Sequence, residues 1–214
     1  MKPLSSVPAI LPTFKSRVVP VVVVSEVPQA VPMAEALLEG GIDVVEITLR
    51  SEAALAGLEA IARAVPNMVV GAGTVTRPDE VQRLLDAGAR FALSPGLTPA
   101  LLAEVKSRGL PFIPGVASPS EAMFARDEGF SLLKCFPAAQ LGGIELLKAW
   151  AGPLPDLRFC PTGGVTEQNL QAFLALPNVA MVGGSWLTPH SLVQARDWAG
   201  ITRLAAAATA LADS

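Results

Sequence analysis

A lysine lies in the middle of an apolar segment that runs from Ser131 to Phe136 and is stopped by Pro137. The segment predicts a short strand, because a proline cannot continue a hydrogen-bonded ladder. An ammonium group is rarely buried without a partner, and loss of water disfavours its charged form. The neutral amine is a nucleophile, so a buried Lys134 suits covalent catalysis. The alternative is a strand-end lysine whose ammonium reaches solvent, and this segment alone leaves both interpretations open.

A second strand-like segment, 44–49, alternates valine, isoleucine and leucine with polar residues and is followed by Arg50. Successive side chains of a strand point to opposite faces, so Glu46, Thr48 and Arg50 share one face. Glu46 and Arg50 are about 13 Å apart along a strand and reach different parts of one cavity. Near an imine-forming lysine, the carboxylate would move protons and the guanidinium would hold a substrate carboxylate. An internal ion pair that only supports the fold is the alternative.

Eight apolar segments, each followed by a segment with helical spacing, would position these residues. They recur roughly every 20–27 residues, which is typical of parallel βαβ units. Eight units predict a single domain over residues 1–214 with the (β/α)8, or TIM-barrel, fold and an irregular or partly helical N-terminal cap over residues 1–17. The expected strands are 18–24, 44–49, 68–74, 90–94, 111–116, 131–136, 158–161 and 179–182, and the expected helices are 31–40, 52–64, 78–87, 99–107, 119–127, 144–150, 167–176 and 200–212.

The carboxyl ends of the strands form the active site in barrels of this kind. Polar groups gather at these positions in the sequence, namely Glu46, Thr48, Arg50, Thr74, Ser94, Lys134, Thr162 and Ser185. The last two expected strands lead into Thr162-Gly163-Gly164 and Gly183-Gly184-Ser185. Paired glycines expose backbone N–H groups to an anion, and loops after strands 7 and 8 commonly bind phosphate in this fold. Tight turns without a ligand are the alternative.

The composition favours a core-rich enzyme domain, since 51% of the residues are hydrophobic, 16% are charged and the net charge is −3. Without a cluster of lysines or arginines, nucleic acid and anionic membranes are poor partners. The apolar run 18–24 is too short to span a bilayer, and no secretion signal is recognised. Cys135 and Cys160 are expected to be reduced core thiols of a cytoplasmic protein. His190, the single histidine, is expected at the surface, and no metal site is expected.

Several motifs in combination resemble the 2-keto-3-deoxy-6-phosphogluconate (KDPG) aldolases, a family that includes 4-hydroxy-2-oxoglutarate (KHG) aldolases. The resemblance extends over nearly the whole chain from Val18 onward, and the N-terminal segment matches least. The motifs are Glu46-Ile47-Thr48-Leu49-Arg50, Gly71-Ala72-Gly73-Thr74-Val75, Ser94-Pro95-Gly96, Lys134-Cys135-Phe136-Pro137-Ala138, Cys160-Pro161-Thr162-Gly163-Gly164 and Gly183-Gly184-Ser185-Trp186.

The resemblance implies a class I aldolase that cleaves KDPG to pyruvate and glyceraldehyde 3-phosphate and also acts on KHG. It implies that Lys134 forms a Schiff base and that Glu46 is the general acid and base. The expected substrate-binding residues are Arg50 and Thr74 for the pyruvate carboxylate, Thr162 for the hydroxyl groups, Gly163, Gly164, Gly184 and Ser185 for the phosphate, and Phe136 beside the lysine. No cofactor is expected, and the resemblance implies a homotrimer.

Two other functions fit parts of the pattern. An isomerase or epimerase with a phosphate-binding barrel would use the same glycine loops, but it would leave a buried Lys134 unexplained. A non-catalytic protein that binds sugar phosphates would keep the pocket without needing Glu46 and Lys134 together.

Overall fold

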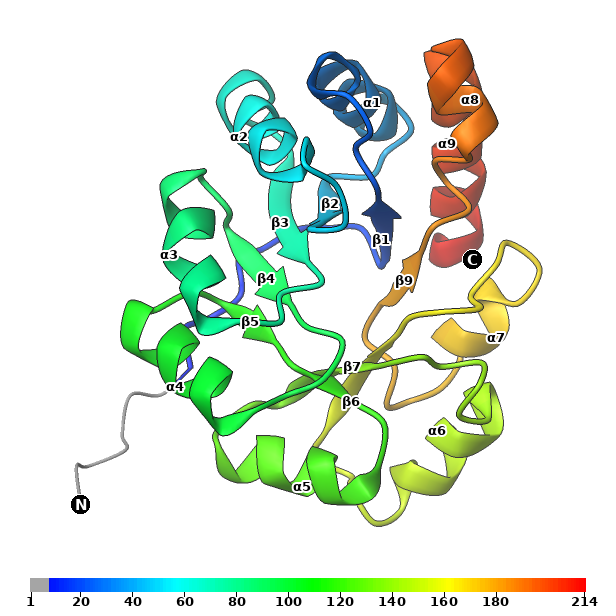
Figure 1. The fold of residues 1–214 in the computed structure, drawn as a ribbon. Helices are drawn as coiled ribbons and strands as arrows, with labels where there is room; N and C mark the ends of the chain where they lie inside the picture. The colour runs from blue at the N-terminus through cyan, green and yellow to red at the C-terminus, as the bar shows by residue number, and fades with distance from the viewer. Residues whose placement is uncertain (1–7) are drawn as a thin grey trace.

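The computed structural model describes residues 8–214, in which strands and helices alternate along the chain. The strands lie inside and the helices lie around them (Figure 1). All pairs of neighbouring strands are parallel, so the predicted α/β class is confirmed. The strands are β1 (Val18–Val22), β2 (Val44–Thr48), β3 (Val69–Gly73), β4 (Phe91–Leu93), β5 (Phe112–Ile113), β6 (Gly115–Val116), β7 (Leu132–Cys135), β8 (Arg158–Pro161) and β9 (Val182–Gly184).

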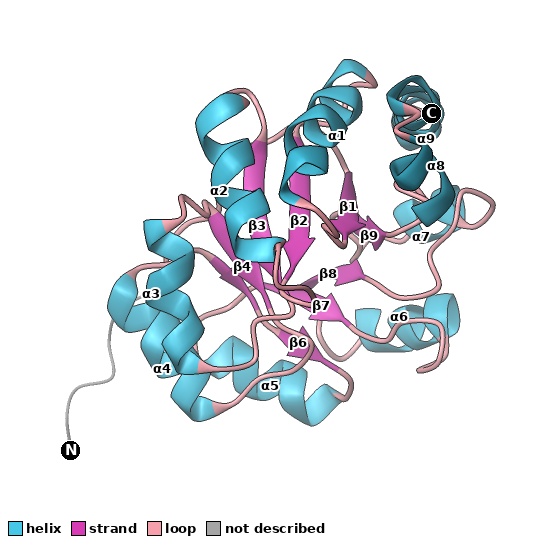
Figure 2. Ribbon diagram, turned by 45° about the horizontal axis from the view of Figure 1, so that its top comes forward, coloured by secondary structure: helices cyan, strands magenta, loops and turns pink. Residues whose placement is uncertain are grey.

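The strands form two curled sheets, a six-stranded one in the order β5-β4-β3-β2-β1-β9 and a three-stranded one in the order β6-β7-β8. Pro114 divides the single strand expected over 111–116, so that β5 pairs with β4 and β6 pairs with β7. Isolated parallel bridges, Phe159 with Val179 and Thr162 with Gly183, connect β8 to the segment that contains β9. The two sheets therefore curve around a common interior (Figure 2).

Helices cover the outer faces of the sheets (Figure 2). Several of them begin where the sequence places a proline in the first turn, a position that needs no N–H donor. The hydroxyl groups of Thr98 and Ser118 cap two of these helices by accepting a backbone N–H. The helices are α1 (Val27–Glu39), α2 (Ala54–Ala64), α3 (Pro78–Asp86), α4 (Pro99–Arg108), α5 (Pro119–Asp127), α6 (Gly143–Ala151), α7 (Leu170–Leu174), α8 (His190–Ala195) and α9 (Trp198–Asp213).

The predicted elements are least accurate near the carboxyl end of the chain. The helix expected over 167–176 is the short α7, because the side chain of Asn169 accepts the Thr166 N–H in a turn that precedes it. The strand expected over 179–182 begins only at Val182, since Val179 forms an isolated bridge. The helix expected over 200–212 is confirmed as α9, but the preceding short helix α8 was not predicted; Arg196, with a left-handed φ of 53°, separates the two.

The described part of the expected N-terminal cap, residues 8–17, contains neither helix nor strand, so it is irregular and not partly helical. Residues 1–7 of the expected cap lie outside the described residues. The backbone N–H groups of Lys15 and Ser16 donate to the carboxylate of Asp43, just before β2 begins. The ring of Phe14 lies 6.1 Å from that of Phe91 on β4, so this segment packs against the sheet.

All five residues of β2 and all five of β3 are buried, as expected for parallel strands covered on both faces. The interior between the strands therefore excludes water except where polar side chains enter it. Among residues 8–214, no helix has the length and apolar character needed to cross a membrane.

Candidate active site

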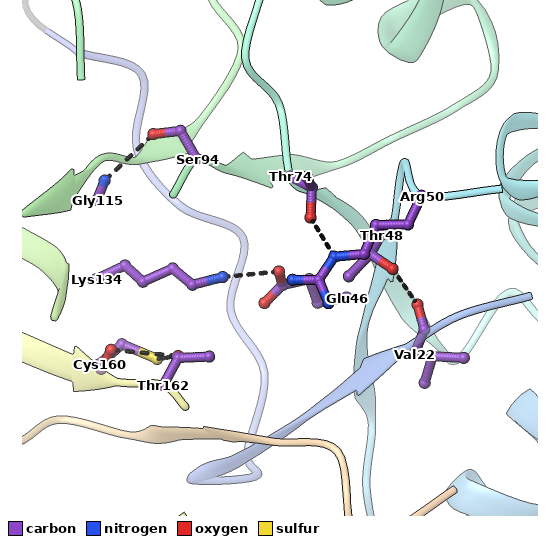
Figure 3. A network of polar contacts seen from close by, with 10 residues as sticks. All are labelled: Val22, Glu46, Thr48, Arg50, Thr74, Ser94, Gly115, Lys134, Cys160 and Thr162. Carbon is purple, nitrogen blue, oxygen red and sulfur yellow. Dashed lines mark hydrogen bonds and ion pairs between the residues drawn. The ribbon is translucent and has the colours of Figure 1, made fainter. Parts of the chain in front are cut away.

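Lys134 on β7 and Glu46 on β2 extend toward each other across the interior (Figure 3). The Nζ of Lys134 lies 2.9 Å from Oε1 of Glu46, and the two side chains are only 4% and 1% exposed. Of the two interpretations of Lys134, the buried one is therefore correct, and both side chains face inward as the strand alternation predicts. The pair can exchange a proton directly because the two atoms are within hydrogen-bond distance.

The carboxylate of Glu46 fits only because β3 carries a glycine beside it. A Cβ at Gly73 would collide with Oε1 and with the rest of the carboxyl group. The second oxygen, Oε2, is buried and has no hydrogen-bond partner among the described residues. An unpaired buried carboxylate oxygen is unfavourable in itself, so it marks a position for a proton or a ligand group.

Phe136 and Cys160 complete the surroundings of the lysine. The Nζ atom lies 5.4 Å from the centre of the Phe136 ring, and Cys160 on β8 is the register partner of Lys134. The thiol of Cys160 lies 3.8 Å from the hydroxyl of Thr162. The amine thus lies near an aromatic ring, and Glu46 is its hydrogen-bond partner.

Arg50 and Thr74 meet at the carboxyl ends of β2 and β3. The Nε–H of Arg50 donates to the hydroxyl of Thr74 at 3.2 Å, and Thr74 has a left-handed φ of 61° (Figure 3). Positive φ is uncommon for a β-branched residue, and such strain often occurs at functional sites. Arg50 itself is exposed, so its guanidinium can also contact a ligand.

Two other polar residues at the strand ends bind the backbone. The hydroxyl of Thr48 donates to the Val22 carbonyl at 2.8 Å, and the Ser94 hydroxyl accepts the Gly115 N–H at 3.2 Å. Both side chains are fully buried. Thr48 joins β2 to β1, and Ser94 joins the end of β4 to β6 of the other sheet, so both hydroxyl groups stabilise the arrangement of the strands.

A pocket of about 140 Å³ opens at the carboxyl ends of β1, β8 and β9. It brings together seven residues expected to bind substrate, while Lys134, Glu46 and Thr74 lie outside its lining. The apolar residues Val21, Val23 and Val165 also line it and were not predicted, because nothing in the sequence distinguishes a valine that lines a pocket from one in the core. The seven predicted residues in the lining are Arg50, Phe136, Thr162, Gly163, Gly164, Gly184 and Ser185.

The glycines of this pocket have the conformations that an anion site needs. Gly163 and Gly164 have φ values of 92° and 82°, and a Cβ at Gly164 would collide with Ala139. Their N–H groups donate to no acceptor among residues 8–214. Free N–H groups in a turn with left-handed residues form a concave site for phosphate or carboxylate oxygens.

The remaining predictions concern His190, a metal site and the two cysteines. His190 is exposed on α8, as predicted. Within the described residues, no group of histidine, cysteine, aspartate and glutamate side chains is arranged to hold a metal ion. Cys135 and Cys160 are free buried thiols, which confirms the prediction that they are not disulfide-bonded.

Burial raises the pKa of the Cys135 thiol to about 11 and that of Cys160 to about 12. For Cys160, the nearby Lys134 opposes this rise and Glu46 adds to it, but loss of water is the larger effect. The thiolate is the reactive form of cysteine, so both side chains stay protonated and unreactive near neutral pH.

We therefore expect both thiols to resist a disulfide reagent such as DTNB at pH 8 while the protein is folded. At pH 9 the reaction should still be much slower than that of the unfolded chain, because the thiolate fraction stays small at a pH well below both raised pKa values. Unfolding in guanidinium should release both thiols, which can be counted by absorbance. Reaction of either thiol in the folded protein at the rate of the unfolded chain would contradict this assignment.

Comparison with known proteins places this site in a family. The family model "KDPG and KHG aldolase" matches residues 11–204. A 2-dehydro-3-deoxy-phosphogluconate aldolase of Pseudoalteromonas atlantica is 50% identical over 90% of each chain. The KHG/KDPG aldolase of Escherichia coli K12 is 48% identical over 88% of each chain.

A solved structure agrees with these relatives. The crystal structure of KDPG aldolase from Legionella pneumophila, with pyruvate captured as a covalent carbinolamine intermediate, is 46% identical to this chain. It superimposes with a TM-score of 0.89 over 91% of this chain and 94% of its own. The resemblance in the sequence motifs is thus confirmed over almost the whole length, and the chain belongs to the KDPG and KHG aldolase family.

Proposed function

We propose that this protein is a class I aldolase that cleaves KDPG to pyruvate and glyceraldehyde 3-phosphate through a Schiff base on Lys134. The observation that carries the proposal is the buried contact between Lys134 and Glu46, beside a pocket with free glycine N–H groups. Relatives about half identical to the chain are KDPG aldolases. The similarity to the KHG/KDPG aldolase of Escherichia coli supports cleavage of KHG as well.

The first step is formation of the imine. Glu46 takes a proton from the ammonium of Lys134 across their 2.9 Å contact, which frees the amine. The amine attacks C2 of the keto acid, and Glu46 returns the proton to the departing hydroxyl group, so that water leaves, an iminium ion forms and Glu46 is a carboxylate again. The low exposure of both side chains keeps bulk water from competing for this proton.

The second step breaks the C3–C4 bond. Glu46, acting through a water molecule, removes the proton of the C4 hydroxyl, and the bonding electrons move into the iminium. Glyceraldehyde 3-phosphate leaves and an enamine remains on the lysine. Protonation of C3 and hydrolysis of the resulting imine then release pyruvate and restore the amine. This reaction requires no cofactor.

Substrate binding uses the surrounding strand ends. Arg50, supported by Thr74, binds the pyruvate carboxylate, and Thr162 contacts the substrate hydroxyl groups. Phe136 forms the apolar side beside the amine. The phosphate lies on the loops after β8 and β9, where its oxygens accept N–H groups and a hydroxyl from Gly163, Gly164, Gly184 and Ser185.

The same proposal includes the wider organisation of the protein. Residues 1–214 form one domain in which eight strand-helix units close a (β/α)8 barrel, with β5 and β6 counted as one strand. The bridges between β8 and the β9 segment support this closure. The resemblance to KDPG aldolases supports a cytoplasmic homotrimer.

We expect pyruvate and borohydride together to add one reduced pyruvyl group to the protein, on Lys134. Its amine is buried among apolar groups beside a proton acceptor, and reduction traps the imine. Intact mass followed by peptide mapping measures the adduct. Lys134→Ala and Lys134→Arg should not be labelled, since a guanidinium does not lose its proton. Labelling of Lys134→Ala at the wild-type level would exclude the imine assignment.

Replacing Glu46 by glutamine should leave slow imine formation but reduce turnover by about 10²–10⁴-fold, the usual contribution of a general acid and base. The amide keeps the shape of the side chain and loses the ability to move a proton. Borohydride trapping measures the imine, and coupled lactate dehydrogenase measures pyruvate release. Normal turnover, with normal proton exchange at C3 of bound pyruvate, would assign the proton transfer to another group.

Ser185→Ala tests recognition of the phosphate. Loss of one hydrogen bond to a charged group should reduce kcat/KM for KDPG by roughly 10- to 100-fold. Cleavage of KHG, which has no phosphate, should change little and serves as the internal control. If both substrates lose equally, Ser185 shapes the catalytic centre and does not bind phosphate.

A further inference from the structure

A second hollow lies directly beside the phosphate pocket. It has a volume of about 400 Å³ and lies between the end of β1 and α8. Figure 1 shows α8 at the same end of the molecule as α1, and α8 packs against α9, which in turn packs against α1. We call this hollow the α8 groove. Val21, Val23 and Ser185 line both the α8 groove and the phosphate pocket, so the two hollows adjoin at these residues.

The wall shared by the two spaces is held in place by hydroxyl groups of the neighbouring segment. Thr48 donates to the Val22 carbonyl at 2.8 Å, and Ser51 donates to the Val24 carbonyl at 2.5 Å. Val23 lies between these two anchored residues, and its side chain is 46% exposed. An apolar side chain on a fixed backbone at the edge of a pocket is available to contact a ligand.

The chemistry of the α8 groove differs from that of the phosphate pocket. Among residues 8–214, no lysine, arginine, aspartate or glutamate lines it, and the only titratable side chain in its lining is that of His190. The remaining surface comes from valine and proline side chains, with hydroxyl groups of serine and threonine. A phosphate in this groove would have no cation to bind. An uncharged chain of carbon atoms would instead be stabilised by burial against the apolar side chains.

We propose that the α8 groove binds the uncharged tail of 4-hydroxy-2-oxo acids that are longer than KDPG. This inference rests on the proposed function, because the reacting end of such a substrate would be held by Lys134. The C4 hydroxyl loses its proton, the C3–C4 bond breaks, and its electrons pass to the iminium. The products are pyruvate and an aldehyde that carries the tail, so no oxidant or other reactant is needed.

The geometry also predicts which carbon atoms of the substrate enter the α8 groove. In the proposed function, the phosphate on C6 of KDPG contacts Ser185, and Ser185 also forms part of the α8 groove. Carbon atoms up to the sixth therefore stay inside the phosphate pocket. Only methylene groups from the seventh carbon onward enter the α8 groove.

The test uses unbranched 4-hydroxy-2-oxo acids of six to ten carbons, with pyruvate release followed by lactate dehydrogenase. For the wild type, kcat/KM should rise by roughly threefold to fourfold for each methylene beyond the sixth carbon. KDPG is measured in parallel. If KDPG releases no pyruvate, the proposed function fails as well; if KDPG is cleaved but kcat/KM does not rise with tail length, only this inference is overturned.

Variants locate the effect in the α8 groove. His190→Trp and Ser25→Trp narrow it from opposite walls at exposed positions. Each should lower kcat/KM for the ten-carbon acid by roughly tenfold, which corresponds to the loss of about two buried methylene groups. Each should keep kcat/KM for KDPG within about twofold of the wild-type value. His190→Ala should retain the preference for long tails, because the space remains open.

Ser191→Trp is the matched control, since Ser191 is an exposed residue of the same helix that does not line the α8 groove. It should leave the dependence on tail length unchanged. Equal losses in His190→Trp and Ser191→Trp would overturn the assignment to the α8 groove.

Discussion

The contact between Lys134 and Glu46 is the constraint on which the rest of the site depends. The two residues are 88 positions apart in the chain and meet in an interior that excludes water. Each charge would lose several kcal/mol of solvation if it were buried alone, so each requires the other. The neighbouring strand must also leave room for the carboxylate, which is why β3 has a glycine at position 73. A pair held in this way is ready to transfer a proton as soon as a substrate carbonyl arrives.

The site separates chemistry from recognition. The lysine and the carboxylate lie within the strands, where packing fixes their positions to within hydrogen-bond distance. In the proposed function, the groups that bind the substrate lie in the loops that follow, where Gly163 and Gly164 present N–H groups that donate to no acceptor among residues 8–214. Val21 and Val23 add an apolar side that continues into the α8 groove. Changes in these loops can therefore alter which substrate binds without moving Lys134 and Glu46.

Local patterns in the sequence predicted most of the fold correctly. Buried parallel strands and amphipathic helices have distinct apolar spacing, and prolines and glycines mark many of the boundaries. The errors occur where tertiary contacts override local preference. Pro114 divides one apolar segment between two sheets, and Val179 forms only a bridge, because pairing depends on where the next strand lies. The short helix α8 has too few residues to show a clear period.

The sequence by itself determined which chemistry is available. Strand alternation is a local property, so the sequence predicts a lysine within one apolar strand and a carboxylate on the inner face of another. It also shows the paired glycines that follow two of the last strands. Only the tertiary structure decided that Lys134 meets Glu46, that Thr48 and Ser94 bind backbone, and that valines of β1 enter the pocket. These outcomes depend on how the strands curve around one interior. That curvature brings together residues far apart in the chain, and no spacing within a single segment encodes it.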